Sequence, residues 1–571
     1  MRTGKLRGKV RFGCAALSLL LSVCAVAQPS HSNSSQLSPI LNYISTSWDA
    51  LTRSMSRCDT VVDPKLSASP VLYLPSGFPI PADVQKLQQD CKVQVEHLPT
   101  VIHKLGEVDM NQISPHGLLF LEHPYVVPGG RFNEMYGWDS YFIIRGLIED
   151  RRLDLAQDMV ENFFFEVDHY GALLNANRTY YLTRSQPPFL SSMAMAVYQA
   201  KEKSGSSNRP WLQSAYDHVS RDYQLWAQEP HLAGDTGLAR YFDFGEGPAP
   251  EGLQDESGHY RQVMTYFLAH PETADNDVIT LKAGENDPNA IGFNFTLQLC
   301  ESSDAATVGT HCNAVKSLSL SRDFYKGDRS MRESGYDIAF RFGPYGAQTH
   351  HYAPVCLNSL LYKTEMDLAQ MADILGKKAD AATWRQRAQA RQNAMNKYLW
   401  NAERGMFFDF DFMTKKQSTY EYATTFYPLW AGVASPEQAS ALRKNLKIFE
   451  QPGGLVMSLH ETGVQWDYPW GWAPDQLPAI EGLRRYGFND DANRLSMKFL
   501  TTVLVNYQKQ GYIVEKYNVV SRSTEAVVSA GYKMNVIGFG WTNGAFLVLL
   551  HALPAPMANT LAKDGASAYQ P

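Results

Sequence analysis

The chain of 571 residues is poor in cysteine and has no large excess of either charge. It contains 7 cysteines, and its formal net charge at pH 7 is −6. So small a charge for this length gives no reason to expect a nucleic acid or another polyanion as a partner. With few cysteines, stability must come mainly from a hydrophobic core, and 44% hydrophobic residues suffice for one. Beyond the N-terminus, no apolar stretch reaches the roughly 20 residues that cross a bilayer, which excludes a membrane protein.

The first 27 residues have the composition of a signal peptide. Basic residues recur from Arg2 to Arg11, an apolar run follows from Cys14 to Val26, and Ala25-Val26-Ala27 has the form of a cleavage site. We therefore expect residues 1–27 to be a signal peptide and the protein to be exported, either periplasmic or secreted. Residues 28–571 are expected to form a single domain with polar N- and C-terminal tails.

Export would permit disulfides, and the cysteines beyond residue 27 are odd in number, so at least one thiol must be free. Cys300 and Cys312 enclose a short loop and are the best candidate pair, although spacing alone does not determine connectivity. Cys356 lies in an apolar helical pattern, which predicts a buried free thiol. Cys58 and Cys91 are left unassigned.

Helical periodicity dominates the chain. From Leu357 to Leu375, leucine and methionine recur at three- and four-residue steps, and Gly376 is placed to end the helix. Ser435-Pro436-Glu437-Gln438 has the form of a capping box at the start of another helix. Period-2 strand patterns are few, and Met406–Phe412 is the clearest. Further helices are expected at residues 380–399, 477–486 and 492–506.

Long segments rich in glycine, proline and aromatic residues separate the helices. Helix pairs that alternate with long loops indicate an α/α toroid with its loops gathered at one end as a binding surface. A generic helical bundle is the alternative, but bundles rarely keep so many long loops. Residues 258–328 are polar and poorly periodic, and we expect an elaborated loop there. The long segments are residues 127–142, 171–189, 335–346, 465–474 and 515–544.

Two of these segments have the residue types that recognise polyhydroxyl compounds. Residues 128–142 read PGGRFNEMYGWDSYF, and residues 465–474 read QWDYPWGWAP. Carboxylates and a guanidinium group bind hydroxyls, while aromatic rings cover the C–H faces of a sugar. A structural turn with an Arg–Asp pair explains the first segment equally well.

These two segments resemble the signature motifs of the trehalases, family 37 of the glycoside hydrolases. The similarity continues in NANRTYYLTRSQPPF (175–189), ESGYD (333–337), EKYN (515–518) and GFGWTNG (538–544). The resemblance implies an all-α (α/α)6 barrel with long catalytic loops at one end. It also implies an enzyme that hydrolyses α,α-trehalose to two glucose molecules with inversion, using no metal or cofactor. We expect this enzyme to be a monomer. The disaccharide substrate is then the expected partner.

By this resemblance, Asp337 matches the general acid of the family and Glu515 matches the general base. Inverting hydrolysis requires such a pair, although the residues alone cannot select it from the many acids in these loops. The structural alternatives are an aspartate that caps the next turn and a glutamate that pairs with Lys516. The family's substrate-binding positions correspond to Arg131, Trp138, Asp139, Asn175, Arg184, Ser185, Gln186 and Gly335.

The chain departs from the family at three places. Tyr336 stands where the family has tryptophan beside the acid. Ala249-Pro250-Glu251 replaces an Arg-Pro-Glu block and so lacks a sugar-site arginine, for which Arg240 and Arg261 are weak substitutes. Residues 529–533 lack a ligand-contacting glutamate, near Tyr532. Because like charges oppose each other's ionisation, we expect its loss to let the base act at lower pH.

Two other functions remain open at this point. One is a related glucosidase for another α-glucoside, which the altered sugar-site positions favour. The other is a sugar-binding protein without catalysis, against which the retention of both Asp337 and Glu515 argues. A glucose-release assay on a panel of α-linked disaccharides separates all three.

Overall fold

The structure is a computed structural model. Its compact unit spans Gln36–Pro571, and all elements described below lie in it. The structure describes residues 35–62, 70–206, 208–251, 258–273, 279–281, 296–300, 315–525, 527–531 and 535–569.

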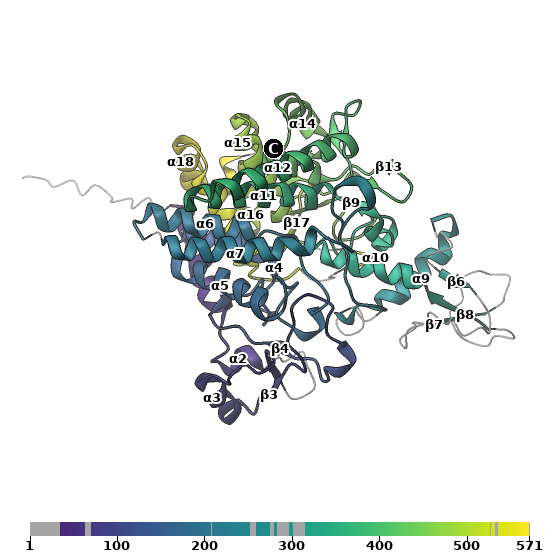
Figure 1. Ribbon diagram of the computed structural model, residues 1–571. Coiled ribbons are helices and arrows are strands. Elements are labelled where there is room, and N and C mark those ends of the chain that lie inside the picture. Colours follow the sequence, from purple (N-terminus) through teal and green to yellow (C-terminus); the bar gives the residue numbers. More distant parts are fainter. Residues whose placement is uncertain are drawn as a thin grey trace, which may run out of the picture. The chain divides into compact units, whose positions relative to one another are not determined.

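Six helices of the described chain form a closed inner ring, in which each packs against the next and the last packs against the first. Figure 1 labels α4, α6, α11 and α15 among them. Their burial explains this position. In the last of them every residue except His551 is buried, so this helix is apolar on all sides and needs neighbours all round. The inner helices are α4 (Gly137–Glu149), α6 (Leu190–Lys203), α11 (Val355–Leu375), α13 (Tyr427–Ala431), α15 (Ala473–Arg485) and α17 (Gly540–His551).

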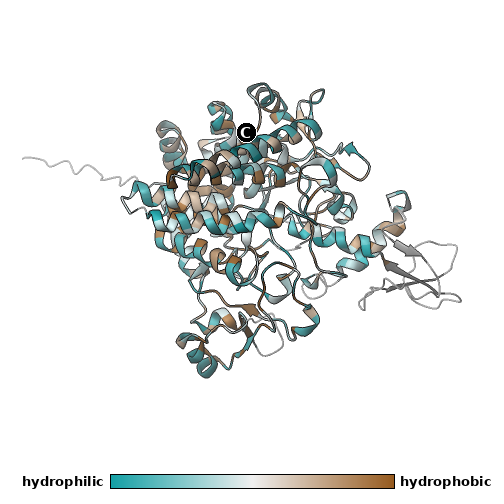
Figure 2. Cartoon of the chain, in the orientation of Figure 1, coloured by the Kyte–Doolittle hydropathy of each residue, from teal (hydrophilic) through white to brown (hydrophobic). Residues whose placement is uncertain are grey.

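An outer helix precedes each inner helix in the chain, which gives the expected (α/α)6 barrel. The outer helices bury only a stripe: α12 buries Ala381, Trp384, Ala388 and Met395, at the three- to four-residue spacing of one helix face. In Figure 2 the exposed helix α7 carries mostly hydrophilic residues. The outer helices are α1 (Ser38–Leu51), α5 (Leu153–His169), α7 (Arg209–Trp226), α12 (Lys378–Tyr398), α14 (Pro436–Phe449) and α16 (Asn489–Gln510).

The helix signals in the sequence are confirmed. Helix α11 ends at Leu375, and Gly376 follows with φ 80°, in the left-handed region that favours glycine. Helix α14 begins with the capping box of Ser435 and Gln438. The expected strand at 406–412 is instead two short strands, β11 (Met406–Phe407) and β12 (Phe410–Asp411).

A small α/β lobe precedes α4 and was not predicted. Strand β2 (Val71–Leu74) lies between β3 (Gln94–His97) and β4 (Leu118–Leu119), and both pairings are parallel. Helices α2 (Cys58–Val61) and α3 (Ala82–Cys91) are joined by a disulfide between Cys58 and Cys91. Four-residue apolar runs such as Val71–Leu74 are too short for periodicity to separate strand from helix.

The predicted loop at 258–328 is wrong, because this segment contains regular elements. Helix α9 (His259–Ala269) buries Tyr260, Val263, Met264 and Phe267, a helical spacing that the polar neighbours obscured. This face packs with Phe324 of α10 (Arg322–Glu333) in a second apolar cluster. Between these helices, strands β6 (Ile279–Leu281), β7 (Thr296–Cys300) and β8 (Val315–Leu320) form an antiparallel sheet of order β6-β8-β7.

Apart from short 3-10 helices, the remaining elements are short antiparallel sheets and one C-terminal helix. One of these sheets has three strands and the others have two. In the three-stranded sheet, β12 lies between β9 (Tyr352–Ala353) and β13 (Lys416–Gln417). The two-stranded sheets pair β1 (Thr52–Arg53) with β5 (Tyr125–Val126), β10 (Trp400–Asn401) with β11, β14 (Glu450–Gln451) with β15 (Gly454–Leu455), and β16 (Trp470–Trp472) with β17 (Lys516–Asn518). The C-terminal helix is α18 (Ala555–Asp564).

The cysteines agree only in part with expectation. Cys356 is buried and free, as predicted. The predicted bond between Cys300 and Cys312 is not tested, because Cys312 and the side chain of Cys300 lie outside the described residues. That disulfide stays a prediction.

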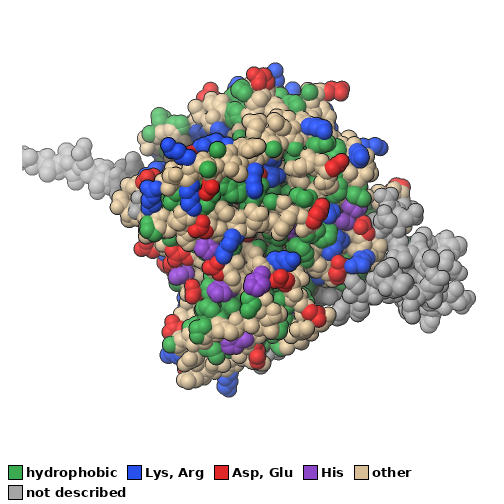
Figure 3. All heavy atoms as spheres, in the orientation of Figure 1, with side chains coloured by type: hydrophobic (Ala, Val, Ile, Leu, Met, Phe, Trp, Pro, Cys, Tyr) green, Lys and Arg blue, Asp and Glu red, His purple; other side chains and the backbone are tan. Residues whose placement is uncertain are grey.

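Basic and acidic side chains are interspersed on the face drawn in Figure 3, as the small net charge suggests. Within the ranges given above, no helix is long and apolar enough to cross a lipid bilayer.

Candidate active site

A pocket lies at the N-terminal end of the inner ring, where α4, α15 and α17 begin. All five long segments rich in glycine and aromatic residues contribute to its wall, as the toroid interpretation predicted. Two of them are joined by strand pairing, since Trp472 of β16 lies opposite Lys516 of β17. Residues more than 370 positions apart in sequence, such as Trp138 and Glu515, therefore share one cavity.

Tryptophan rings form one wall of this pocket. Trp466 and Trp472 stack with ring centroids 3.8 Å apart and an interplanar angle of 9°. Trp138 lies 5.8 Å from Trp466 and 5.8 Å from Trp541. All four rings are buried. A wall of this kind covers the apolar face of a pyranose and excludes water from it.

Gly335 is required at its position by both conformation and space. Its φ is +76°, and a Cβ atom there would lie 2.7 Å from Cε2 and Cζ2 of Trp138. Helix α10 ends at Glu333, and the left-handed turn at Gly335 directs the chain so that Asp337 reaches the pocket. Asp337 is half-buried.

Glu515 lies on the pocket wall with 3% of its surface exposed. The ammonium group of Lys516 donates to its Oε2 at 2.8 Å and to Oε1 of Gln465 at 3.2 Å. Nε2 of Gln465 donates in turn to the backbone oxygen of Asp337. The pairing with Lys516, considered above as a structural alternative, is therefore present, and it occurs inside the pocket.

A third carboxyl group stands close to Asp337 and Glu515. Burial raises the pKa of Asp139 well above its usual value, and the negative charges of Glu515 and Asp337 raise it further. Asp139 is 4% exposed and lines the same pocket. The neutral form of Asp139 can donate a hydrogen bond to a substrate hydroxyl.

Three arginines line the pocket. Arg131 is exposed at its edge. Arg184 is buried and pairs with Glu251 and, at 3.6 Å, with Asp243. Burial lowers the pKa of Arg184, but these two acids outweigh it, so the net shift is upward and the group stays cationic.

The third arginine, Arg332 of α10, was missed in the sequence. It lines the pocket, and its Nη1 lies 3.8 Å from Oε1 of Glu251. Ala249, where the family has arginine, is fully buried, and its N–H donates to the Tyr260 hydroxyl. Neither Arg240 nor Arg261 lines the pocket. The sequence feature that could have identified Arg332 is its position immediately before the Glu-Ser-Gly block, five residues before Asp337.

Of the other predicted binding residues, Asn175 and Gln186 line the pocket and Ser185 does not. The Oγ of Ser185 donates to the backbone oxygen of Leu173 at 2.7 Å, which turns it away from the pocket. Oε1 of Gln186 accepts from the backbone N–H of Trp138 at 2.9 Å and so holds the first turn of α4. Tyr532 lies outside the described residues, and the prediction made there stays untested.

Tyr336, which replaces a tryptophan of the family, packs behind the wall rather than in the pocket. Its ring centroid lies 5.4 Å from that of Trp138 and 5.1 Å from that of Trp466. Its hydroxyl donates to Oδ1 of Asp475 at 3.3 Å. Burial raises the pKa of Asp475 to about 8. The replacement of tryptophan by Tyr336 therefore changes the packing and hydrogen bonding behind the pocket wall.

Two groups of side chains among the described residues could hold a metal ion. Each group offers ligand atoms within 4.8 Å of one another. Neither group lies in the pocket. The groups are Asp323 with His350 and His351, and His123 with Asp158 and Glu161.

Comparisons with known proteins agree with this geometry. The family model Trehalase matches residues 63–291 and 294–554. A cytosolic neutral trehalase from Neurospora crassa is 35% identical over 90% of this chain and 73% of that protein. One from Saccharomyces cerevisiae is 36% identical over 88% of this chain and 70% of that protein. The solved structure of a neutral trehalase from Saccharomyces cerevisiae is similar with a TM-score of 0.72 and 31% identity, covering 92% of this chain and 96% of the other.

The same relatives contradict the predicted export. They are named cytosolic, so the prediction of a periplasmic or secreted protein from residues 1–27 is wrong. The prediction rested only on composition, a basic stretch followed by an apolar run. A segment of that composition does not have to function as an export signal.

The family match extends over most of the sequence, and the similarity in structure covers 92% of this chain. The matched region includes every segment that lines the pocket. The chain therefore belongs to the trehalase family of glycoside hydrolases.

Proposed function

We propose that this enzyme hydrolyses α,α-trehalose to two glucose molecules in a single inverting displacement, with Asp337 as general acid and Glu515 as general base. The observation that supports it is the meeting of these two carboxyl groups in one pocket walled by tryptophans. Inverting hydrolysis needs one carboxyl group to protonate the leaving oxygen and another to activate water on the opposite face.

In the reaction, the proton of Asp337 passes to the glycosidic oxygen as the C–O bond breaks. Glu515 removes a proton from the water that attacks the anomeric carbon. After the step Asp337 is ionised and Glu515 is protonated, and proton exchange with solvent restores both. The Lys516 ammonium group donates to Oε2 of Glu515 at 2.8 Å and so holds this carboxyl group in place on the pocket wall.

The arginines and the aromatic wall orient the sugar. Arg131, Arg184 and Arg332 present N–H donors to hydroxyl oxygens, and the tryptophans cover the C–H faces. Arg332 supplies from α10 the charge that Ala249 cannot supply. Ser185 acts indirectly, through its hydrogen bond to the backbone of Leu173.

The stereochemistry of the products tests the mechanism. Inversion at one α-linked carbon releases one β-glucose and one α-glucose from each trehalose. Proton NMR during the first turnovers should detect both anomers in equal amounts before mutarotation. Initial formation of α-glucose alone would exclude a single displacement.

We further propose that the enzyme acts as a monomer. The inner ring closes within this chain, because its last helix packs against its first. Size-exclusion chromatography with light scattering should give a mass near 64.1 kDa for the full chain. A stable dimer would contradict this.

A further inference from the structure

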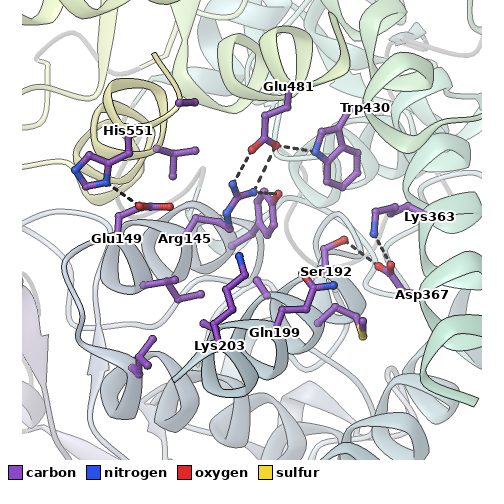
Figure 4. A pocket seen from close by; sticks show the side chains of 18 of the residues that line it. Arg145, Glu149, Ser192, Gln199, Lys203, Lys363, Asp367, Trp430, Glu481 and His551 are labelled. Atoms are coloured by element: carbon purple, nitrogen blue, oxygen red, sulfur yellow. Dashed lines mark hydrogen bonds and ion pairs between the residues drawn. The ribbon is translucent and has the colours of Figure 1, made fainter. Parts of the chain in front are cut away.

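A second cavity lies at the opposite end of the inner ring (Figure 4). Its volume is about 1290 Å³, and all six inner helices contribute to its lining. In α4, Trp138 lines the sugar pocket while Ile148 lines this cavity. Ten residues of α-helix span about 15 Å, so the two sites are distinct.

Cationic side chains outnumber carboxylates in this cavity. The whole chain has the reverse balance, with 52 Lys and Arg against 58 Asp and Glu, so the excess of cations is local. The carboxylates that line the cavity are Glu149, Asp367 and Glu481. The cations are Arg145, Arg151, Lys203, Lys363, Arg484 and Arg485.

Each of the carboxylates already has a basic partner. Glu481 accepts from Arg145 at 2.6 Å and also from the indole N–H of Trp430 at 3.1 Å. Asp367 pairs with Lys363 and also accepts from Ser191 and Ser192. Glu149 pairs with His551 at 2.7 Å.

Four cations remain beyond these pairs. Arg151, Lys203, Arg484 and Arg485 form no ion pair with any residue in the described parts of the chain. In Figure 4 the side chain of Lys203 extends into the cavity toward the Arg145–Glu481 pair. Like charges that share a cavity repel one another, and a bound anion would relieve that repulsion.

The guanidinium group of Arg484 gives the most direct indication of a missing hydrogen-bond acceptor. Its Nε and Nη2 atoms are buried and make no hydrogen bond to the described residues. A buried N–H group without an acceptor has lost its hydrogen bonds to water and gained none in return, which destabilises the empty cavity. The nearest acid, Glu481, is already engaged by Arg145 and Trp430.

Helix dipoles explain part of this arrangement but not all of it. Lys203 and Arg485 lie in the last turns of α6 and α15, where the negative end of the helix favours a cation. A cation in that role can stay in water. The dipole gives no reason for Arg484 to bury two N–H groups without acceptors.

We propose that this cavity binds a phosphate monoester of hexose size. A phosphate monoester has a charge close to −2 and several acceptor oxygens, which suits two guanidinium forks and an ammonium group better than a singly charged carboxylate does. Arg484, Arg485 and Lys203 would hold the phosphate. Gln199 and Gln370, also in the lining, offer hydrogen bonds to sugar hydroxyls. The volume leaves room for the whole molecule.

Isothermal titration of the full chain tests this proposal with glucose 6-phosphate, inorganic phosphate and glucose as probes. We expect glucose 6-phosphate to bind more tightly than inorganic phosphate, and glucose to show no binding here. Binding should weaken as salt is added, because charges at an open cavity are screened. At equal concentrations, the thermal midpoint should rise more with glucose 6-phosphate than with inorganic phosphate.

Two variants locate the site, and a third is their control. Arg484→Met and Lys203→Met should each weaken binding of glucose 6-phosphate at least about tenfold. Lys444→Met, on the exposed face of the outer helix α14, should leave it unchanged. Lys203 is exposed, so its variant should fold even if the Arg484 variant does not.

Absence of binding at millimolar concentrations, or equal weakening by Lys444→Met, would overturn the proposal. Equal affinity for inorganic phosphate would overturn the assignment to a sugar ester. Binding is measured without turnover, so failure here is distinguishable from failure of the proposed hydrolysis. The variants should keep the basal rate of trehalose hydrolysis, because the cavity lies at the other end of the barrel.

Discussion

The ammonium nitrogen of Lys516 lies 2.8 Å from Oε2 of Glu515, and neither side chain is more than 4% exposed. The two residues are neighbours at the start of the short strand β17, which pairs with β16. A backbone hydrogen bond and the indole N–H of Trp541, which donates to the Glu515 backbone oxygen at 2.9 Å, hold the segment in place. The cation beside the proposed base is therefore a fixed part of the site.

Replacing Lys516 by methionine should lower kcat/KM at least about tenfold. The substitution keeps most of the side-chain volume and removes the ammonium group that donates to Oε2 of Glu515 and to Oε1 of Gln465, so the proposed base loses a contact that positions it. Initial rates of glucose release at low substrate concentration are the measurement. Lys444→Met, on the exposed face of α14, is the control and should keep its kinetic constants. Unchanged kcat/KM in a folded Lys516→Met variant would show that this contact does not position the base.

Asp337→Asn and Glu515→Gln should each lower kcat at least about a hundredfold while the protein remains folded. Both substitutions keep the size and shape of the side chain and remove the ability to exchange a proton. Initial rates of glucose release and the circular dichroism spectrum check the two parts of the prediction. Asp490→Asn, an exposed residue in the first turn of α16, is the control and should retain full activity. Near-normal activity in a folded variant would remove that residue from its role.

Gly335→Ala should lower kcat/KM at least about tenfold and destabilise the fold by roughly 1–3 kcal/mol. The added methyl group would lie 2.7 Å from the Trp138 ring, in addition to the strain of φ +76°. Gly487→Ala is a matched control, because its φ is +78° and nothing lies within 4 Å of the added atom. It should lose stability through strain alone and keep its kinetic constants. Equal kinetic losses in both variants would mean that contact with Trp138 is not responsible.

Asp475→Asn should remove a pH dependence of stability between pH 4 and 8. Burial raises the pKa of Asp475 from 3.8 to about 8, so within this interval the folded chain holds a proton that the unfolded chain has released. Its contribution to stability therefore falls as pH rises, by about 1.4 kcal/mol per pH unit at most. Asparagine does not titrate, so the unfolding free energy of the variant relative to the parent should increase with pH.

Urea unfolding at several pH values measures that difference. Asp490→Asn, which changes an exposed acid in a neighbouring helix, should follow the parent at every pH. A constant difference between the Asp475 variant and the parent across the interval would show that Asp475 is ionised throughout.

Much of the barrel could be predicted from local patterns. The apolar spacing of Leu357–Leu375 and the capping box at Ser435 depend on residues within a few turns of one helix. They can therefore be recognised in the sequence without knowing which other segments pack against that helix. The gathering of the five aromatic loops at one end followed from alternating helices and long loops. Naming Asp337 and Glu515 required resemblance to a family, since many acids in these loops are equivalent by composition.

Other features depended on which distant segments meet, and only the tertiary structure decided them. Arg332 reaches the pocket because α10 runs beside Glu251, and Ser185 turns away because the Leu173 carbonyl lies within 2.7 Å. The Cys58–Cys91 disulfide follows from the fold of the N-terminal lobe. The cationic cavity requires all six inner helices to end around one space. Residue type and spacing determine the elements and their buried faces, whereas the approach of side chains across the ring depends on packing between segments hundreds of residues apart.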